Sequence, residues 1–172
     1  MELKRIIEAV LFSSARPVSL RLLSKKLSDF PADDVAGALR ELQTEYNASD
    51  RAVAIHEVSG GYQIRTKADY REWVTRFVRE KDVGLTRSLI ETLSIIAYKQ
   101  PIAKREIDRA RGVDSTRAIT QLLERRLIEL GGRLEDAGKP MVFRTTGLFL
   151  EIFGLKNIAD LPTYGEIEAL QA

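Results

Sequence analysis

The chain has 172 residues, a formal net charge of +2 and no cysteine. This length allows one compact domain or two small ones, and the apolar and charged fractions of 44% and 30% are ordinary for a globular protein. The lack of cysteine excludes disulfides, thiolate metal sites and a cysteine nucleophile, and it fits a cytoplasmic protein.

Targeting and charge patterns narrow the class further. The N-terminal stretch contains Glu2 and Glu8 and lacks a small-residue cleavage site, so it is not a signal peptide. No apolar run approaches the roughly 18 residues that indicate a membrane span. Residues 1–82 and residues 83–172 each carry a net charge of +1. This balance disfavours a protein that binds nucleic acid mainly by neutralising phosphates.

The first half of the chain predicts three helices followed by a hairpin. Residues 3–13 repeat apolar side chains at helical spacing, and two further helices are expected after Ser19 and after Pro31. Two alternating runs flank Gly60-Gly61, which predicts a β-hairpin. Three helices and then a hairpin is the order of a winged-helix domain, a helix-turn-helix variant. A further helix is expected over about residues 69–80, with one side formed by Tyr70, Trp73, Val74 and Phe77.

The second half repeats this plan after a charged, glycine-ended stretch over residues 80–84 that suits a linker. Its opening helix, at about 86–98, is the most apolar helical run in the chain. We expect it to be the central helix of a domain, covered on most sides. The elements that follow are a short helix after Pro101, a third helix capped by Asp114 or Ser115, a strand over 128–134, a turn over 136–140, a return strand over 141–146, and a short helix holding Leu148, Phe149 and Phe153.

Two short matches indicate that the halves are a tandem repeat. Pro17-Val18-Ser19 matches Pro101-Ile102-Ala103, and Ile64-Arg65-Thr66 matches Phe143-Arg144-Thr145, each at the same place in its half. The predicted fold is therefore mainly α with small β-hairpins (α+β), in two tandem winged-helix domains over residues 1–82 and 83–172.

Catalytic machinery is not visible in the sequence. The single histidine, His56, lies in a predicted strand, and no carboxylate pair stands out from the helix surfaces. Gly60-Gly61 and Gly131-Gly132 lack the helix and the lysine of a phosphate loop. No ligand spacing supports a metal site. We therefore expect a protein that is not an enzyme, with no catalytic residue, cofactor or metal.

The fold suggests a winged-helix DNA-binding transcriptional regulator as the alternative function. In such modules the N-terminal residues of the third helix read base edges. In the first half this helix begins Ala32-Asp33-Asp34, which phosphate would repel. In the second half Arg117 and Gln121 are chemically suitable. A solvated helix face is the preferred interpretation there, because acidic residues interleave and the half is nearly neutral.

Apolar surface is the remaining signal in the first half. Its first helix and the helix that holds Trp73 offer more large side chains than one small winged helix readily covers. Such an excess is consistent with a self-complementary interface in a two-fold dimer. The residues expected in this homodimer interface are Leu3, Ile6, Ile7, Trp73 and Phe77.

Several segments, taken together, resemble a known family. They are Glu91-Thr92-Leu93-Ser94-Ile95-Ile96-Ala97-Tyr98-Lys99-Gln100-Pro101, then Arg111-Gly112-Val113-Asp114-Ser115, with Gly60-Gly61-Tyr62, Leu122-Leu123-Glu124-Arg125, Thr145-Thr146, Phe149–Lys156 and Asp160-Leu161-Pro162 in support. Through them the chain resembles the bacterial segregation and condensation protein B family, subunits of the SMC–kleisin condensin.

This resemblance implies a non-catalytic role in chromosome condensation and segregation, with ATP hydrolysis left to the SMC partner. It implies dimerisation through the first domain and binding of the kleisin subunit, segregation and condensation protein A, chiefly through the second. We expect a cytoplasmic, nucleoid-associated protein with weak or absent direct DNA binding and no membrane contact. The residues expected to contact the kleisin are Tyr98, Lys99, Gln100, Pro101, Phe149 and Phe153.

Overall fold

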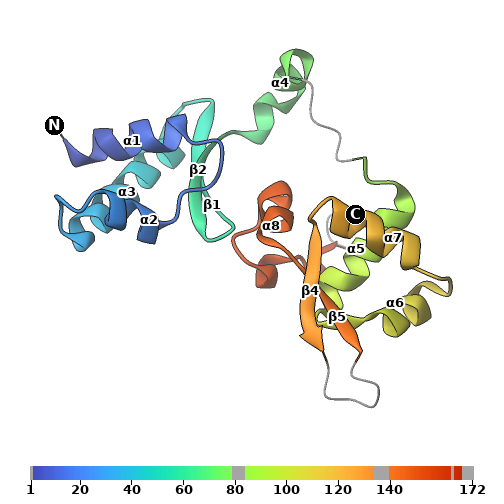
Figure 1. Ribbon diagram of the computed structural model, residues 1–172. Helices are drawn as coiled ribbons and strands as arrows, with labels where there is room; N and C mark the ends of the chain where they lie inside the picture. The colour runs from blue at the N-terminus through green and yellow to red at the C-terminus, as the bar shows by residue number, and fades with distance from the viewer. Residues whose placement is uncertain (1, 79–83, 134–139, 164, 168–172) are drawn as a thin grey trace. The chain divides into compact units, whose positions relative to one another are not determined.

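The chain divides into two compact units, Met1–Lys81 and Asp82–Ala172. The computed structural model describes residues 2–78, 84–133, 140–163 and 165–167. Each unit combines helices with a small antiparallel sheet, which confirms the α+β class (Figure 1). Residues 80–83 of the predicted linker and 136–139 of the predicted turn lie outside the described residues.

The first unit contains three helices, a hairpin and a short terminal helix, in the predicted order. The predicted helix over residues 69–80 is a 3₁₀ turn followed by a short α-helix, and residues 79 and 80 lie outside the described part of the chain. The elements are α1 (Leu3–Ser13), α2 (Leu20–Lys26), α3 (Ala32–Ala48), β1 (Val53–Val58), β2 (Gly61–Thr66), η1 (Ala68–Tyr70) and α4 (Arg71–Phe77).

The core of the first unit forms between α1, α3 and the hairpin. α1 buries Ile7 and Leu11, which are one helical turn apart, and α3 buries four residues at helical spacing. The Tyr46 hydroxyl of α3 also donates to Glu8 Oε1 of α1 at 2.5 Å. This bond lowers the pKa of the Glu8 carboxyl, while burial raises the pKa of Tyr46. α1 and α3 are therefore joined by both apolar packing and a charge-assisted hydrogen bond.

The hairpin of the first unit receives a third backbone segment just before α2. Val18 and Tyr62 exchange two backbone N–H···O bonds of 2.9 Å. Gly61 permits this approach, because a Cβ there would lie 3.0 Å from backbone atoms of Pro17 and Val18. The segment before α2 is thus tied to β2, as the first strand of a winged helix is tied to its wing.

The second unit repeats this architecture with a complete three-stranded sheet of order β3-β5-β4. Figure 1 shows its helices α5, α6 and α7 beside that sheet. The elements are α5 (Arg87–Lys99), β3 (Ile102–Ala103), α6 (Lys104–Arg111), α7 (Thr116–Glu124), β4 (Ile128–Arg133), β5 (Met141–Thr145), α8 (Gly147–Phe153) and the 3₁₀ turn η2 (Ile158–Asp160).

α5 supplies the centre of the second core, as predicted. Its buried face contains Leu93, Ile96 and Ala97, together with Thr92, whose Oγ1 donates to a backbone carbonyl in the preceding turn. The expectation that α5 is covered on most sides is wrong, because Ile90 remains 50% exposed. The other elements pack against one face of this helix and leave the opposite face open.

The strand pairings place the two halves of the repeat in register. Val18 pairs with Tyr62 in the first unit and Ile102 pairs with Phe143 in the second, so the first sequence match marks equivalent backbone positions. These pairings make Tyr62 the counterpart of Phe143. The second match, which sets Ile64 against Phe143, is therefore displaced by two residues, a shift that keeps the same sheet face.

Candidate functional site

The first candidate surface is the aromatic side of α4. This helix buries none of its residues. Trp73 is 58% exposed and Phe77 is 89% exposed, and half-exposed Tyr70 lies one turn before Trp73. The Arg76 guanidinium lies 4.3 Å from the centre of the Trp73 ring and pairs with the Glu72 carboxylate. A short helix with this much open aromatic area is typical of an interaction surface.

The other residues expected in a dimer interface lie on α1, and they differ in burial. Ile7 is completely buried in the core of its own unit, so its assignment to an interface is corrected. Leu3 and Ile6 are half-buried. Helical periodicity placed all three on one apolar face, and α3 already covers the middle of that face. Phe12, at the end of α1 and 81% exposed, was not anticipated.

The second candidate surface begins at the C-terminal end of α5. Tyr98 is 52% exposed, and its hydroxyl donates to the Pro162 carbonyl oxygen at 2.7 Å. Lys99 is exposed. The Tyr98 bond joins the end of α5 to a segment 64 residues later. The ring of Tyr98 therefore has a fixed position while much of its surface stays open.

The next two residues mainly shape the backbone. The Gln100 side-chain oxygen accepts bonds of 2.6 Å from the Thr145 amide and 3.0 Å from the Thr145 hydroxyl. Gln100 is half-buried, and the Gln100–Pro101 peptide bond is cis. Pro101 itself is exposed. Gln100 thus fastens the start of β3 to the end of β5, and its side-chain oxygen is occupied by bonds within its own unit.

The two expected phenylalanines of α8 differ in exposure. Phe149 is 3% exposed and belongs to the core, so its expected contact with a partner is corrected. Phe153 is 49% exposed, and its ring centre lies 4.7 Å from that of Phe149. Stacking on a buried ring holds Phe153 in place as an open aromatic surface. Leu148 and Ile152 of the same helix are also exposed.

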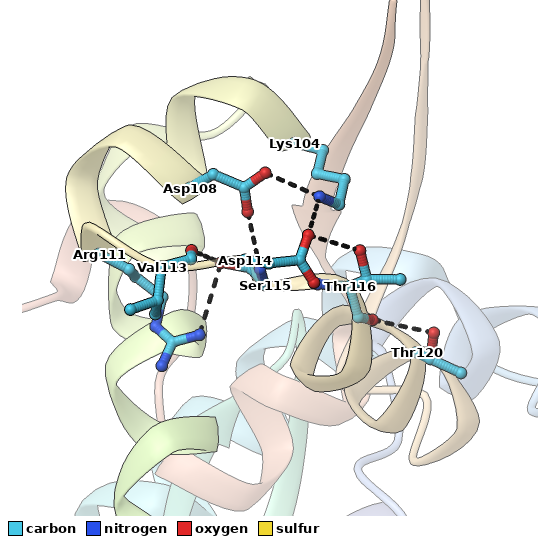
Figure 2. Close-up of polar contacts among 8 residues, drawn as sticks. All are labelled: Lys104, Asp108, Arg111, Val113, Asp114, Ser115, Thr116 and Thr120. Atoms are coloured by element: carbon cyan, nitrogen blue, oxygen red, sulfur yellow. Dashed lines mark hydrogen bonds and ion pairs between the residues drawn. The ribbon is translucent and has the colours of Figure 1, made fainter.

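The Arg111–Ser115 segment forms a polar network that fixes the turn between α6 and α7 (Figure 2). Lys104 Nζ lies 2.7 Å from Asp108 Oδ2 and 2.6 Å from Asp114 Oδ1. Asp108 Oδ1 accepts from the Ser115 amide at 2.7 Å, and Asp114 accepts from the Thr116 amide and hydroxyl. The lysine lowers the pKa of both carboxyls. These contacts hold the turn between α6 and α7 in place. They give the Arg111–Ser115 motif a structural role.

This network was missed by the sequence reasoning, although part of its signal was present. Lys104 and Asp108 are four residues apart in a helix, the spacing of a helical ion pair. Asp114, two residues before Thr116, is typical of a helix start. The link between these two features depends on the turn and could not be read from spacing.

Other site types find no support in the described part of the chain. Residues 2–78, 84–133, 140–163 and 165–167 contain no group of three or more His, Asp or Glu side chains placed to hold a metal ion. None of the helices within those ranges has the length and apolar character that crossing a membrane requires.

The fold and these surfaces define the class: a tandem winged-helix protein with exposed aromatic surface on each unit. Residues 5–164 match the family model described as "Segregation and condensation complex subunit ScpB". The chain belongs to this family, as its resemblance predicted. Segregation and condensation protein B of Syntrophotalea carbinolica is 42% identical over 170 residues, covering 99% of this chain and 86% of that protein.

Solved structures of ScpB proteins are also similar to this chain. The crystal structure of ScpB from Mycobacterium tuberculosis is 32% identical, covers 90% of this chain and 96% of that chain, and has a TM-score of 0.41. A crystal structure of a dimer of the ScpB N-terminal domain complexed with ScpA peptide is 24% identical, covers 44% of this chain and 93% of that chain, and has a TM-score of 0.40. The family match and the Syntrophotalea carbinolica relative give no support to the transcription-regulator alternative.

Proposed function

We propose that this chain is a non-catalytic subunit of a bacterial SMC–kleisin condensin. In this role it is a dimeric adaptor that holds the kleisin chain, segregation and condensation protein A, during chromosome condensation and segregation. The observation that carries the proposal is the family match over residues 5–164. The protein works in the cytoplasm in association with the nucleoid, and ATP hydrolysis belongs to the SMC partner.

The first domain, residues 1–82, supplies the dimer interface in this proposal. The support is the α4 aromatic surface, because Trp73 and Phe77 remain 58% and 89% exposed. Leu3 and Ile6, half-buried on α1, can add to the same interface. A two-fold contact uses each residue twice, so a short helix can supply much of the apolar area.

The second domain, residues 83–172, supplies the kleisin contact. Its support is the pair of fixed but open aromatic rings, Tyr98 and Phe153. Lys99 adds an exposed cation and Pro101 an exposed apolar ring. Gln100 holds this surface in shape through β5 and is a positioning residue.

Co-purification with the kleisin tests the proposal directly. The full chain and its kleisin are expressed together, and the mass of the purified complex is measured by light scattering. We expect a complex whose mass includes two copies of this chain. A protein that runs as a monomer and elutes apart from the kleisin would overturn both parts of the proposal.

A further inference from the structure

A cavity of about 510 Å³ in the second unit has no part in the proposed function. It lies where the start of α5 meets α7 and the turn between α6 and α7. Its polar walls include the hydroxyl residues Thr86 and Ser88, two arginines, Arg111 and Arg117, and Gln121. Cavities of this size are in the range that proteins use for small molecules.

Arg111 is the central feature of this cavity, because it is a buried cation with incomplete pairing. Its side chain is only 8% exposed, and its Nε atom is buried without a hydrogen-bond partner among the described residues. Its Nη2 donates to Ser88 Oγ at 2.9 Å and lies 3.5 Å from a Glu91 oxygen. Its Nη1 donates to Ser115 Oγ at 3.4 Å (Figure 2). Its one carboxylate partner is 55% exposed, and the buried Nε donor is left unsatisfied among the described residues, which is costly for a buried guanidinium.

The start of α5 adds to the positive field. This helix has thirteen residues, no side-chain cap from Thr86 and no acidic residue in its first turn. Its first amides and its dipole therefore favour an anion. Arg117, exposed on α7, contributes a second guanidinium. Asp114 also lines the cavity, but its carboxylate is engaged by Lys104 and by Thr116.

We propose that this cavity binds a phosphate monoester, such as a mononucleotide. A helix start, two hydroxyls and two guanidiniums supply donors from different elements, which suits the three terminal oxygens of a phosphate better than the two of a carboxylate. The volume exceeds what a phosphate group fills. The remaining wall is apolar, from Leu89, Val113 and Ala118, and can cover the group attached to the phosphate.

Binding is tested on the full chain by ¹H–¹⁵N NMR, with inorganic phosphate and AMP titrated separately at constant ionic strength. We expect saturable shifts of the amides at the start of α5 in both titrations. AMP binding more tightly than phosphate would assign the apolar wall to the base, and equal affinities would assign the binding to the phosphate group; both outcomes support the site. An absence of saturable shifts with either probe overturns it.

Three variants separate a built site from general attraction to a cation. Arg117→Gln should weaken binding about tenfold, as expected when one charge-assisted bond is lost. Arg109→Gln removes the same charge from an exposed position of α6 that does not line this cavity, and it should leave the affinity unchanged. Gln121→Glu, which places an anion in the cavity wall, should abolish binding. Equal weakening by Arg109→Gln, or none by the other two, contradicts the proposal.

Discussion

Substituting Trp73 by alanine should convert a dimer of this chain largely to monomers. The ring is 58% exposed in the single chain. A Trp side chain buries about 150–250 Å², so about 90–145 Å² is left to cover, worth about 2–4 kcal/mol at 25 cal/mol/Å². A two-fold interface loses this twice. The expected loss of at least about 4 kcal/mol raises the dissociation constant about a thousandfold.

The assay is sedimentation equilibrium over a range of protein concentrations, with circular dichroism to verify the fold. Because α4 buries none of its residues, Trp73→Ala should leave the melting temperature of the monomer nearly unchanged. Phe153→Ala is the matched control, since it removes an exposed aromatic ring from the second unit. A dissociation constant that is unaltered by Trp73→Ala, or raised equally by Phe153→Ala, would show that α4 is not the dimer contact.

Three further variants test the second surface and the first core. Replacing Tyr98 and Lys99 together by alanine should weaken the kleisin complex at least tenfold in calorimetry, while the free energy of unfolding changes by no more than about 1 kcal/mol. Unaltered affinity would remove both residues from the contact. Gln100→Ala should lower the free energy of unfolding by about 1–3 kcal/mol in urea, because two half-buried Thr145 donors lose their acceptor. A neutral result would contradict that role. Tyr46→Phe should lower the free energy of unfolding by about 1–2 kcal/mol at pH 7. The folded-state pKa of Glu8 is below its unfolded value, so this stabilisation is present above the unfolded pKa and lost as pH falls through the folded one. The Tyr46→Phe effect should therefore shrink in acid, and urea titrations showing the same difference at pH 7 and pH 3 would refute this account.

Helical periodicity predicted the cores because it reports which side of a helix is apolar. It placed Leu93 and Ile96 correctly, and both are buried. The same pattern does not say which molecule covers an apolar side. Ile7 and Trp73 were therefore assigned to one interface, although Ile7 is completely buried in the core of its own unit and Trp73 is 58% exposed.

The polar ties of the second unit could not be predicted from sequence for a different reason. Gln100 and Thr145 are 45 residues apart, and they meet only because β3 pairs with β5. Tyr98 and Pro162 are separated by 64 residues. No local spacing encodes such contacts. The sequence therefore identified the segment that ends in Tyr98, Lys99, Gln100 and Pro101 as distinctive, but it did not give the role of each residue.

These ties change how the same segment is to be tested for partner binding. Gln100 accepts two bonds from β5, so its loss would loosen the joint between α5 and the hairpin and weaken any partner indirectly. Lys99 is exposed, and its replacement reports on contact alone. Tyr98 has both tasks, since its hydroxyl is bound to the Pro162 carbonyl while half of its surface is open. Tyr98→Phe keeps the ring and removes the tie, so comparing it with Tyr98→Ala separates the positioning of the surface from its recognition by the kleisin.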